Sequence, residues 1–274
     1  MSMSKLMPVI VRKVGEKMKY IVIKCGGSVL DELSTSFFTS LSELKKQGYK
    51  LVFVHGGGPD INDMLELCNI TPQFVNGLRK TDEQSLLIAE MILSGQTNRK
   101  LVALLQQHHF SAIGINGSDA YCLQADYLNR EELGFVGEIK KVNLEYVELV
   151  VNGNYIPVIT PIGITQNGEK LNINADYVSA EIAKALSAEQ CLFVTNVDGV
   201  FINGSLTSKL SKQEIDSFIA NGEINGGMIP KVTSALNALE RGVKSVMIVS
   251  GKKPFFESGK WNGTRIYHKE PITN

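Results

Sequence analysis

The segments YIVIKCGGS, at residues 20–28, and LVFVHGGGP, at residues 51–59, decide the fold of this chain. Each is a short apolar run, rich in β-branched residues, that ends in a glycine cluster, as a buried strand does where it opens into a tight turn. Apolar residues at helical spacing follow both segments, over residues 37–44 and 61–68. Strand, glycine turn and helix repeated in this order favour a parallel sheet.

The rest of the chain continues this alternation. A capping-box pattern at Thr81-Asp82-Glu83-Gln84 predicts the start of a long helix, bent near residues 94–95 and ending near residue 107. We expect further strands at 112–115, 155–164, 191–197, 245–249 and 264–267, helices at 144–151, 175–186, 212–220 and 230–241, and irregular short strands within 121–142. The predicted fold class is α/β. We expect a three-layer α/β/α sandwich with an open, mainly parallel sheet and two lobes.

Composition limits the functions that this chain can have. Its 274 residues suffice for an N-terminal extension, residues 1–19, and two lobes, residues 20–168 and 169–274, divided at a polar turn. Lys plus Arg and Asp plus Glu both number 28, and no basic stripe marks a surface for nucleic acid or an anionic membrane. No apolar run is long enough for a membrane-spanning helix. Four scattered cysteines without a C-x-x-C pattern suit a reducing cytoplasm.

The glycine clusters are candidates for anion binding. Gly27, and Gly56 with Gly57, follow strands and precede helices, where backbone N–H groups and helix dipoles attract phosphate. Glycines that only permit tight turns remain the alternative for either cluster alone. Lys24 stands beside the first cluster, so its ammonium is expected near a bound anion, although an edge strand or a structural ion pair also explains a lysine there.

Two later segments add charged and amide candidates. Lys231 follows a Gly-Gly loop at the start of a helix, where a bound phosphate would relieve the conflict between its charge and the helix dipole; a solvated surface lysine is the alternative. Asn172 and Asn174 face the same side of an extended stretch that leads to Asp176 at a helix start. Asp176 either orients lysine ammonium groups or is only a charge at a helix N-terminus.

Six sequence pieces, in this order, resemble the amino-acid kinase family: IKCGGS, VHGGGP, VNGLRKT, LNINAD, TNVDGV and GGMIPK. The resemblance covers residues 20 to about 267, and its NGLR piece is the most discriminating for an acetylglutamate substrate. It implies a cytoplasmic enzyme, expected as a homodimer, that phosphorylates the side-chain carboxylate of N-acetylglutamate with ATP in arginine biosynthesis. Magnesium is expected on the phosphates of ATP and on water, without dedicated protein ligands.

The resemblance also implies roles for individual residues. Catalysis is implied for Lys24, Lys231 and Asp176. Substrate binding is implied for Gly27, Gly56, Gly57, Arg79, Asn172 and Asn174. Nucleotide binding is implied for Asn196, Val197, Asp198, Gly199, Val200 and Phe201, and for Glu223, Ile224 and Asn225. His55, at the end of a strand, is interpreted as a packed, hydrogen-bonded residue and not as a base.

Two alternative functions stay open. A related kinase could act on glutamate, aspartate or carrier-linked aminoadipate, although Arg79 argues for a substrate with a free α-carboxylate. A nucleotide-binding sensor could also use this fold without catalysis, because fold alone does not settle function. The presence of Lys24, Asp176 and Lys231 together disfavours the sensor.

Overall fold

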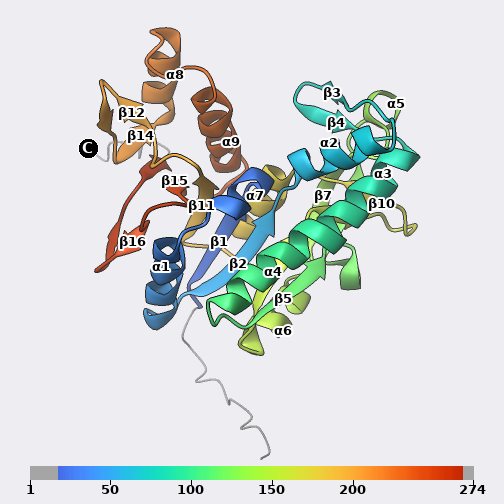
Figure 1. The fold of residues 1–274 in the computed structure, drawn as a ribbon, viewed down its shortest axis with the longest axis horizontal. Coiled ribbons are helices and arrows are strands. Elements are labelled where there is room, and N and C mark those ends of the chain that lie inside the picture. The colour runs from blue at the N-terminus through green and yellow to red at the C-terminus, as the bar shows by residue number, and fades with distance from the viewer. Residues whose placement is uncertain (1–17, 268–274) are drawn as a thin grey trace, which may run out of the picture.

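The computed structural model describes residues 18–267, so residues 1–17 of the predicted extension lie outside the described residues. A central eight-stranded sheet has the order β14-β18-β15-β11-β1-β2-β8-β5 (Figure 1). Its strands are β1 (Tyr20–Cys25), β2 (Lys50–His55), β5 (Ala112–Asn116), β8 (Ile156–Thr160), β11 (Gln190–Thr195), β14 (Lys209–Ser211), β15 (Val246–Ser250) and β18 (Thr264–Tyr267). All neighbouring pairs are parallel except β15 with β18, which confirms the predicted, mainly parallel sheet.

Helices cover both faces of this sheet and confirm the α/β/α layering. They are α1 (Thr35–Lys46), α2 (Gly58–Leu67), α3 (Glu83–Glu90), α4 (Asn98–Gln107), α5 (Arg130–Leu133), α6 (Leu144–Asn152), α7 (Ala175–Ala185), α8 (Lys212–Ala220) and α9 (Met228–Glu240). Apolar side chains of α1 and α4 pack on one face, and those of α6, α7, α8 and α9 pack on the other. No helix within residues 18–267 has both the length and the apolar character needed to cross a membrane.

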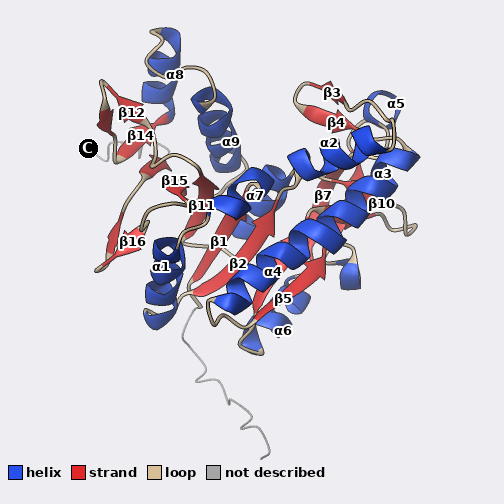
Figure 2. Cartoon of the chain, in the orientation of Figure 1, coloured by secondary structure: helices blue, strands red, loops and turns tan. Residues whose placement is uncertain are grey.

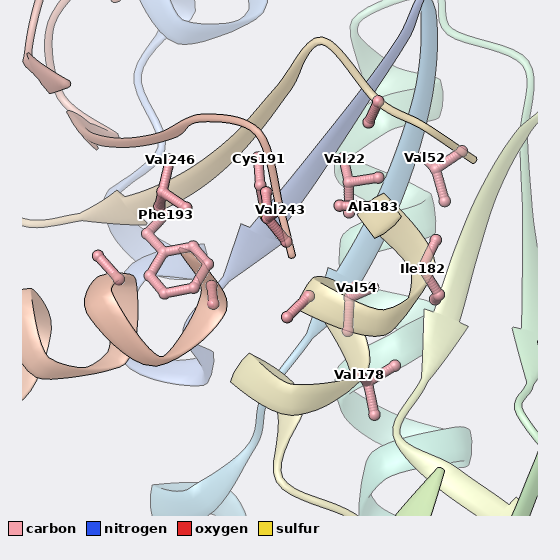
Figure 3. Packing of buried hydrophobic residues seen from close by; sticks show 14 of the residues in the cluster. Val22, Val52, Val54, Val178, Ile182, Ala183, Cys191, Phe193, Val243 and Val246 are labelled. Atoms are coloured by element: carbon pink, nitrogen blue, oxygen red, sulfur yellow. The ribbon is translucent and has the colours of Figure 1, made fainter. Parts of the chain in front are cut away.

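Alternate residues of the central strands supply the two cores, because successive side chains of a strand point to opposite faces. Val22 of β1 and Val54 of β2 pack against α7, whereas Ile23 and Phe53 pack on the side of α1. Figure 3 shows the first of these cores, with Val178 of α7 among its members. Burial on both faces explains why these strands are continuous apolar runs.

The long predicted helix is one rod with an irregular middle (Figure 2). Helix α3 passes into a π-helical turn, η2 (Met91–Thr97), which passes into α4, so the irregularity predicted near residues 94–95 is a π turn. The predicted capping box was wrong by one residue. Asp82 is the N-cap and accepts a hydrogen bond from the Ser85 N–H at 2.7 Å, while the Thr81 hydroxyl is used elsewhere.

The predicted strand at 155–164 was also wrong, because it is two strands in two sheets. Strand β8 ends at Thr160, and Pro161, which has no N–H to donate, separates it from β9 (Ile162–Ile164). A second sheet has the order β10-β9-β6-β7 and contains β6 (Leu123–Tyr127), β7 (Gly137–Val142) and β10 (Lys170–Asn172). Small hairpins complete the fold: β3 (Gln73–Val75) with β4 (Leu78–Lys80), β12 (Phe201–Ile202) with β13 (Ser205–Leu206), and β16 (Phe256–Glu257) with β17 (Lys260–Trp261).

Candidate active site

A cavity of about 210 Å³ lies beyond the carboxyl ends of β1 and β2. Ligands of parallel sheets bind at this edge, because the chain leaves every strand there in an open loop. The cavity is lined by Lys24, Gly56, Gly57, Gly58, Ile61, Phe74, Gly77, Leu78, Arg79, Leu93, Val136, Pro161, Asn172, Ile173, Asn174, Ala175 and Asp176. Seven of the predicted site residues therefore meet in one place: Lys24, Gly56, Gly57, Arg79, Asn172, Asn174 and Asp176.

Lys24 and Asp176 form an ion pair on one wall of the cavity. Lys24 Nζ lies 2.8 Å from Asp176 Oδ1, and the two side chains are only 20 % and 19 % exposed. The other carboxylate oxygen, Oδ2, accepts a hydrogen bond from the Ser234 hydroxyl of α9 at 2.7 Å. Asp176 therefore joins β1, α7 and α9, and its carboxylate fixes the direction in which the lysine ammonium points.

The protonation state of this pair follows from its surroundings. Burial alone would raise the pKa of Asp176, but the Lys24 charge and the hydrogen bonds from Lys24 and Ser234 outweigh it, so the pKa lies below its ordinary value. Asp176 is thus an anion at neutral pH. Because the carboxylate is already occupied, it suits the orientation of Lys24 better than the abstraction of a proton.

The two glycine loops touch each other at the floor of the cavity. A Cβ on Gly27 would lie 2.8 Å from the Gly57 Cα, and a Cβ on Gly57 would lie 2.7 Å from Leu93 Cδ2. A side chain at Gly27 would force the two loops apart, and one at Gly57 would displace Leu93 and Thr97 of η2. Gly56 and Gly57 line the cavity, and Gly27 packs behind them, against Gly57.

Arg79 forms the opposite wall and keeps part of its guanidinium free. Arg79 lies on β4, and its guanidinium carbon is 4.8 Å from the centre of the Phe74 ring on β3. Its Nη2 donates to Asn62 Oδ1 at 2.6 Å and to the Gly58 carbonyl at 3.2 Å. Among the described residues, its buried Nη1 has no hydrogen-bond partner. A buried donor without a partner costs free energy, which an acceptor on a bound ligand would recover.

Asn172 and Asn174 both line the cavity, but they are held in different ways. Asn172, at the end of β10, donates from Nδ2 to the Thr81 hydroxyl at 3.2 Å. Asn174 is the N-cap of α7, and its Oδ1 accepts from the backbone N–H groups of Asp176 and Tyr177. The capping oxygen is therefore committed to the helix, and only the amide nitrogen of Asn174 is left for a ligand.

Lys231 lies outside the lining of this cavity and donates from Nζ to the Gly227 carbonyl at 3.2 Å. It is three residues before Ser234 on α9, so the two side chains are neighbours on one helix face. Because Ser234 bonds to Asp176, Lys231 lies on the part of α9 that adjoins the ion pair.

The two segments expected to bind nucleotide also lie outside that lining. Asp198 pairs with Lys253 at 2.5 Å, and Glu223 is hydrogen-bonded to Asn221. The side chains of Val200 and Ile224 are buried in the core, so these two residues can meet a nucleotide only through their backbone.

Sequence reasoning missed the apolar part of the lining. Phe74 and Leu78 come from the β3–β4 hairpin, which was not predicted, although an Asn-Gly pair such as Asn76-Gly77 is a strong hairpin signal. Asn76 and Gly77 have φ of 50° and 79°, as a turn of this kind requires. Leu93 comes from η2, and no local pattern indicates which strand end a helix will reach.

Groups with nucleophilic or basic potential near the site are held inactive. His55 is fully buried, and it bonds to the Gly56 carbonyl through Nδ1 at 3.1 Å and to Asn98 and Thr160 through Nε2, as predicted. Burial is the main reason that the pKa of His55 is lowered to about 4. Burial also raises the pKa of Cys25 and Cys191 to about 12, so neither thiol is ionised at neutral pH.

Comparisons with known proteins agree with this geometry. The model of the amino acid kinase family matches residues 19–250. The acetylglutamate kinase of Geobacillus sp. (strain WCH70) is 51 % identical over 248 residues, which are 90 % of this chain and 96 % of the relative. A crystal structure from Streptococcus mutans UA159 superposes with a TM-score of 0.79 at 32 % identity, covering 91 % of this chain and 99 % of that one.

A more distant structure shares the fold alone. Carbamate kinase from Giardia lamblia bound to AMP-PNP superposes with a TM-score of 0.61 at 16 % identity, over 92 % of this chain and 99 % of that one. The family model covers most of the sequence, and the Geobacillus relative aligns over nearly its whole length. On these grounds, this chain belongs to the amino acid kinase family.

Proposed function

We propose that this chain transfers the γ-phosphoryl group of ATP to the side-chain carboxylate of N-acetylglutamate, in arginine biosynthesis. The observation that carries the proposal is the buried, unpartnered Nη1 of Arg79, which shares a cavity with the Lys24–Asp176 ion pair. Because Nη2 already bonds to Asn62 and Gly58, Nη1 supplies the charge-assisted hydrogen bond to a carboxylate. Arg79 binds the α-carboxylate, and the side-chain carboxylate meets Lys24 at the other wall.

The reaction needs charge stabilisation more than proton transfer. A carboxylate oxygen of the substrate attacks the γ-phosphorus, the bond to the β,γ-bridging oxygen breaks, and ADP leaves with the acyl phosphate formed. The attacking carboxylate is ionised at neutral pH, so the site needs no general base. Lys24 stabilises the charge on the transferring group, Asp176 orients Lys24, and Lys231 acts from the leaving side.

Neutral donors position the amino-acid substrate. The free amide nitrogen of Asn174 and the amide of Asn172 hold the acetylamino portion, and the Gly57 N–H donates to substrate and phosphoryl oxygens. The Gly56 N–H donates to the Cys25 carbonyl at 2.9 Å, so Gly56 contributes only its backbone surface to the substrate site. Gly27 supports these donors by its contact with Gly57. Every one of these groups is fixed by a helix cap, a strand end or a close backbone approach, which favours catalysis by positioning.

ATP binds on the side of residues 169–274, and the amino-acid substrate binds mainly to residues 20–168. Asn196 to Phe201 and Glu223 to Asn225 contact the nucleotide. Within residues 18–267, no three His, Cys, Asp or Glu side chains come together as a metal site. Magnesium held mainly by the phosphate oxygens of ATP and by water would supply further charge neutralisation.

The test is acyl-phosphate formation trapped as a hydroxamate. N-Acetylglutamate, glutamate, aspartate and aminoadipate are offered in parallel with ATP and magnesium. We expect strong preference for N-acetylglutamate. Preference for another acid would overturn the role of Arg79 and leave a related kinase, and absence of turnover with all four would favour the sensor.

We also propose that the protein is a cytoplasmic homodimer. Strand β5 is an edge of the central sheet, and its Ile113 is 38 % exposed. Met91 of η2, which contacts β5, is 54 % exposed, and Leu87 of α3, the helix that leads into η2, is 59 % exposed. An open edge with exposed apolar side chains is suited to pairing with a second copy. Light scattering during gel filtration should give twice the mass of one chain, and Leu87→Glu should lower that mass.

A further inference from the structure

Thr81, at the base of the β3–β4 hairpin, joins two of the cavity walls. Its side chain is fully buried, and it lies outside the lining of the cavity. The Thr81 hydroxyl donates to the Arg79 carbonyl at 2.8 Å and accepts from Asn172 Nδ2 at 3.2 Å. One hydroxyl thus connects the backbone of the arginine with the side chain of the asparagine.

Backbone bonds close this connection into a ring. The Phe135 N–H donates to the Thr81 carbonyl at 2.7 Å, and the Asn172 N–H donates to the Phe135 carbonyl at 2.9 Å. Gly134, with φ of 72°, lets the chains approach, because a Cβ there would lie 2.3 Å from the Thr81 carbonyl oxygen. Thr81, Phe135 and Asn172 are therefore linked in pairs, and the hydroxyl extends the ring to Arg79.

At its base the hairpin is also held by the Thr81 N–H, which donates to the Leu133 carbonyl of α5 at 2.9 Å, but its tip is open. Phe74 is 53 % exposed, and the tip at Asn76 and Gly77 is exposed as well. On its far side, Arg79 is held by Asn62 and Gly58 of α2. The position of the guanidinium thus depends on α2 at one end and on Thr81 at the other.

We propose that Thr81 is a positioning residue, which sets the guanidinium of Arg79 and the amide of Asn172 at a fixed separation so that both engage one amino-acid substrate. This inference rests on the proposed function. Valine has the shape of threonine but can neither donate to Arg79 nor accept from Asn172, so both partners lose a hydrogen bond. Serine retains both bonds.

The experiment compares Thr81→Val with Thr81→Ser in the full-length protein. Calorimetric titration with N-acetylglutamate should show a dissociation constant about tenfold higher in Thr81→Val, and within about twofold of the wild type in Thr81→Ser. The KM for ATP should stay unchanged in both. A double variant of Thr81→Val with Asn172→Ala should lose less than the product of the single losses, because the two residues act together.

Thr165→Val is the matched control. Thr165 is another buried threonine of this region, and its hydroxyl accepts from the Glu169 N–H in the turn between β9 and β10, outside the lining of the cavity. Thr165→Val should bind N-acetylglutamate with the affinity of the wild type. Tight binding by Thr81→Val, or an equal loss in Thr165→Val, would overturn the proposal.

A second readout separates this inference from the proposed function. Amide hydrogen exchange over residues 73–80 of the unliganded protein should be faster in Thr81→Val than in Thr81→Ser, whichever substrate the enzyme uses. Equal exchange would overturn the inference even if N-acetylglutamate binds. If Thr81→Val does not fold, Asn172→Ala should accelerate exchange over the same residues, and unchanged exchange would overturn the inference. Failure of the wild type to bind N-acetylglutamate counts against the proposed function alone.

Discussion

The amino-acid side and the nucleotide side of the proposed site differ in how their side chains are held. Lys24, Arg79 and Asp176 bond to groups on other elements of the fold, around one cavity. Lys231 bonds to a carbonyl four residues away and Glu223 to a side chain two residues away, and on this side Asp198 has a distant partner, Lys253. A hydrogen bond to a distant segment is maintained by the whole fold, whereas a ligand can easily replace a hydrogen bond to a residue nearby in the sequence.

This difference indicates what the protein must give up when each substrate binds. The amino-acid side is preorganised, so little side-chain entropy is lost when a ligand enters it. The nucleotide side must exchange existing bonds for new ones. Substitution of Arg79 on the first side should therefore weaken binding of the amino-acid substrate, whereas substitution of Lys24 or Lys231, which contact the transferring group, should act chiefly on the rate.

Lys24→Met is the strongest test of the preorganised side. Methionine keeps the length of the stem and removes the charge, so kcat should fall about 1,000-fold, as when one stabilising donor is lost from an active site. Steady-state assays of ADP release measure this. Lys24→Arg, which keeps the charge, should retain more activity, and a fall of less than tenfold in Lys24→Met would refute the role of the lysine.

His55, next to Gly56 on the amino-acid side, should make the free energy of unfolding sensitive to acid. Its pKa in the folded protein is about 4, below the ordinary value of 6.5. Between these values the unfolded chain binds a proton that the folded chain does not, so the free energy of unfolding should fall by about 3 kcal/mol as the pH drops from 6.5 to 4. Urea denaturation at several pH values measures this.

Asp176 also loses its ion pair in acid, so a variant must isolate the part that belongs to His55. His55→Gln should flatten the pH dependence, and His109→Gln, at an exposed position, should leave it unchanged. Nitrogen NMR of the wild type gives an independent check. Protonation of the His55 imidazole near pH 6.5 would contradict the prediction.

Lys231→Ala tests the nucleotide side. Its contact with the phosphoryl group would strengthen in the transition state, so kcat should fall about 100-fold while the KM of each substrate changes less than about threefold. A large rise in the KM for ATP with kcat unchanged would show that Lys231 binds the ground state, and would remove the contrast between the two sides.

Arg79→Ala should give the opposite pattern. Loss of a charged pair to the α-carboxylate should raise the KM for N-acetylglutamate about 30-fold and leave the KM for ATP nearly unchanged. Arg79→Lys should recover part of the loss, since it restores the charge without the planar fork. Equal losses for both substrates would indicate a damaged fold.

Sequence reasoning succeeded where one short segment contains the whole signal. The central residues of the strands Tyr20–Cys25 and Lys50–His55 are apolar because they are buried on both faces, and Gly27 is required by the close approach of the two loops. Family resemblance added Arg79, which no local pattern singles out.

The remaining errors concern choices between nearby partners. Asp82 rather than Thr81 caps α3, and Asn174 caps α7 although it was expected only to face a substrate. At α3, the adjacent Thr81 and Asp82 could both cap the helix, and the bonds of the Thr81 hydroxyl to Arg79 and Asn172 leave the cap to Asp82. At α7, the cap is Asn174, two residues before the acid that was expected at the helix start. The apolar wall of the cavity was missed for a related reason, because it forms only when η2 and a hairpin reach the ends of β1 and β2.

The π turn η2 also restricts how the length of this chain can change during evolution. Leu93 and Thr97 of this turn both lie against Gly57, and α4 continues from it without a break. Such a turn holds one residue more than an ordinary α-helix, because its hydrogen bonds span five residues instead of four. Deleting one residue between Met91 and Thr97 would restore the α-helical pattern and keep α4 near its present rotation, so Leu101 and Leu105 would stay in the core. The loss would fall on the contacts of Leu93 and Thr97 with Gly57. A deletion within α3 or α4, by contrast, would rotate the rest of the rod by about 100° per residue. Changes in length along this rod should therefore be tolerated better at the turn than beside it.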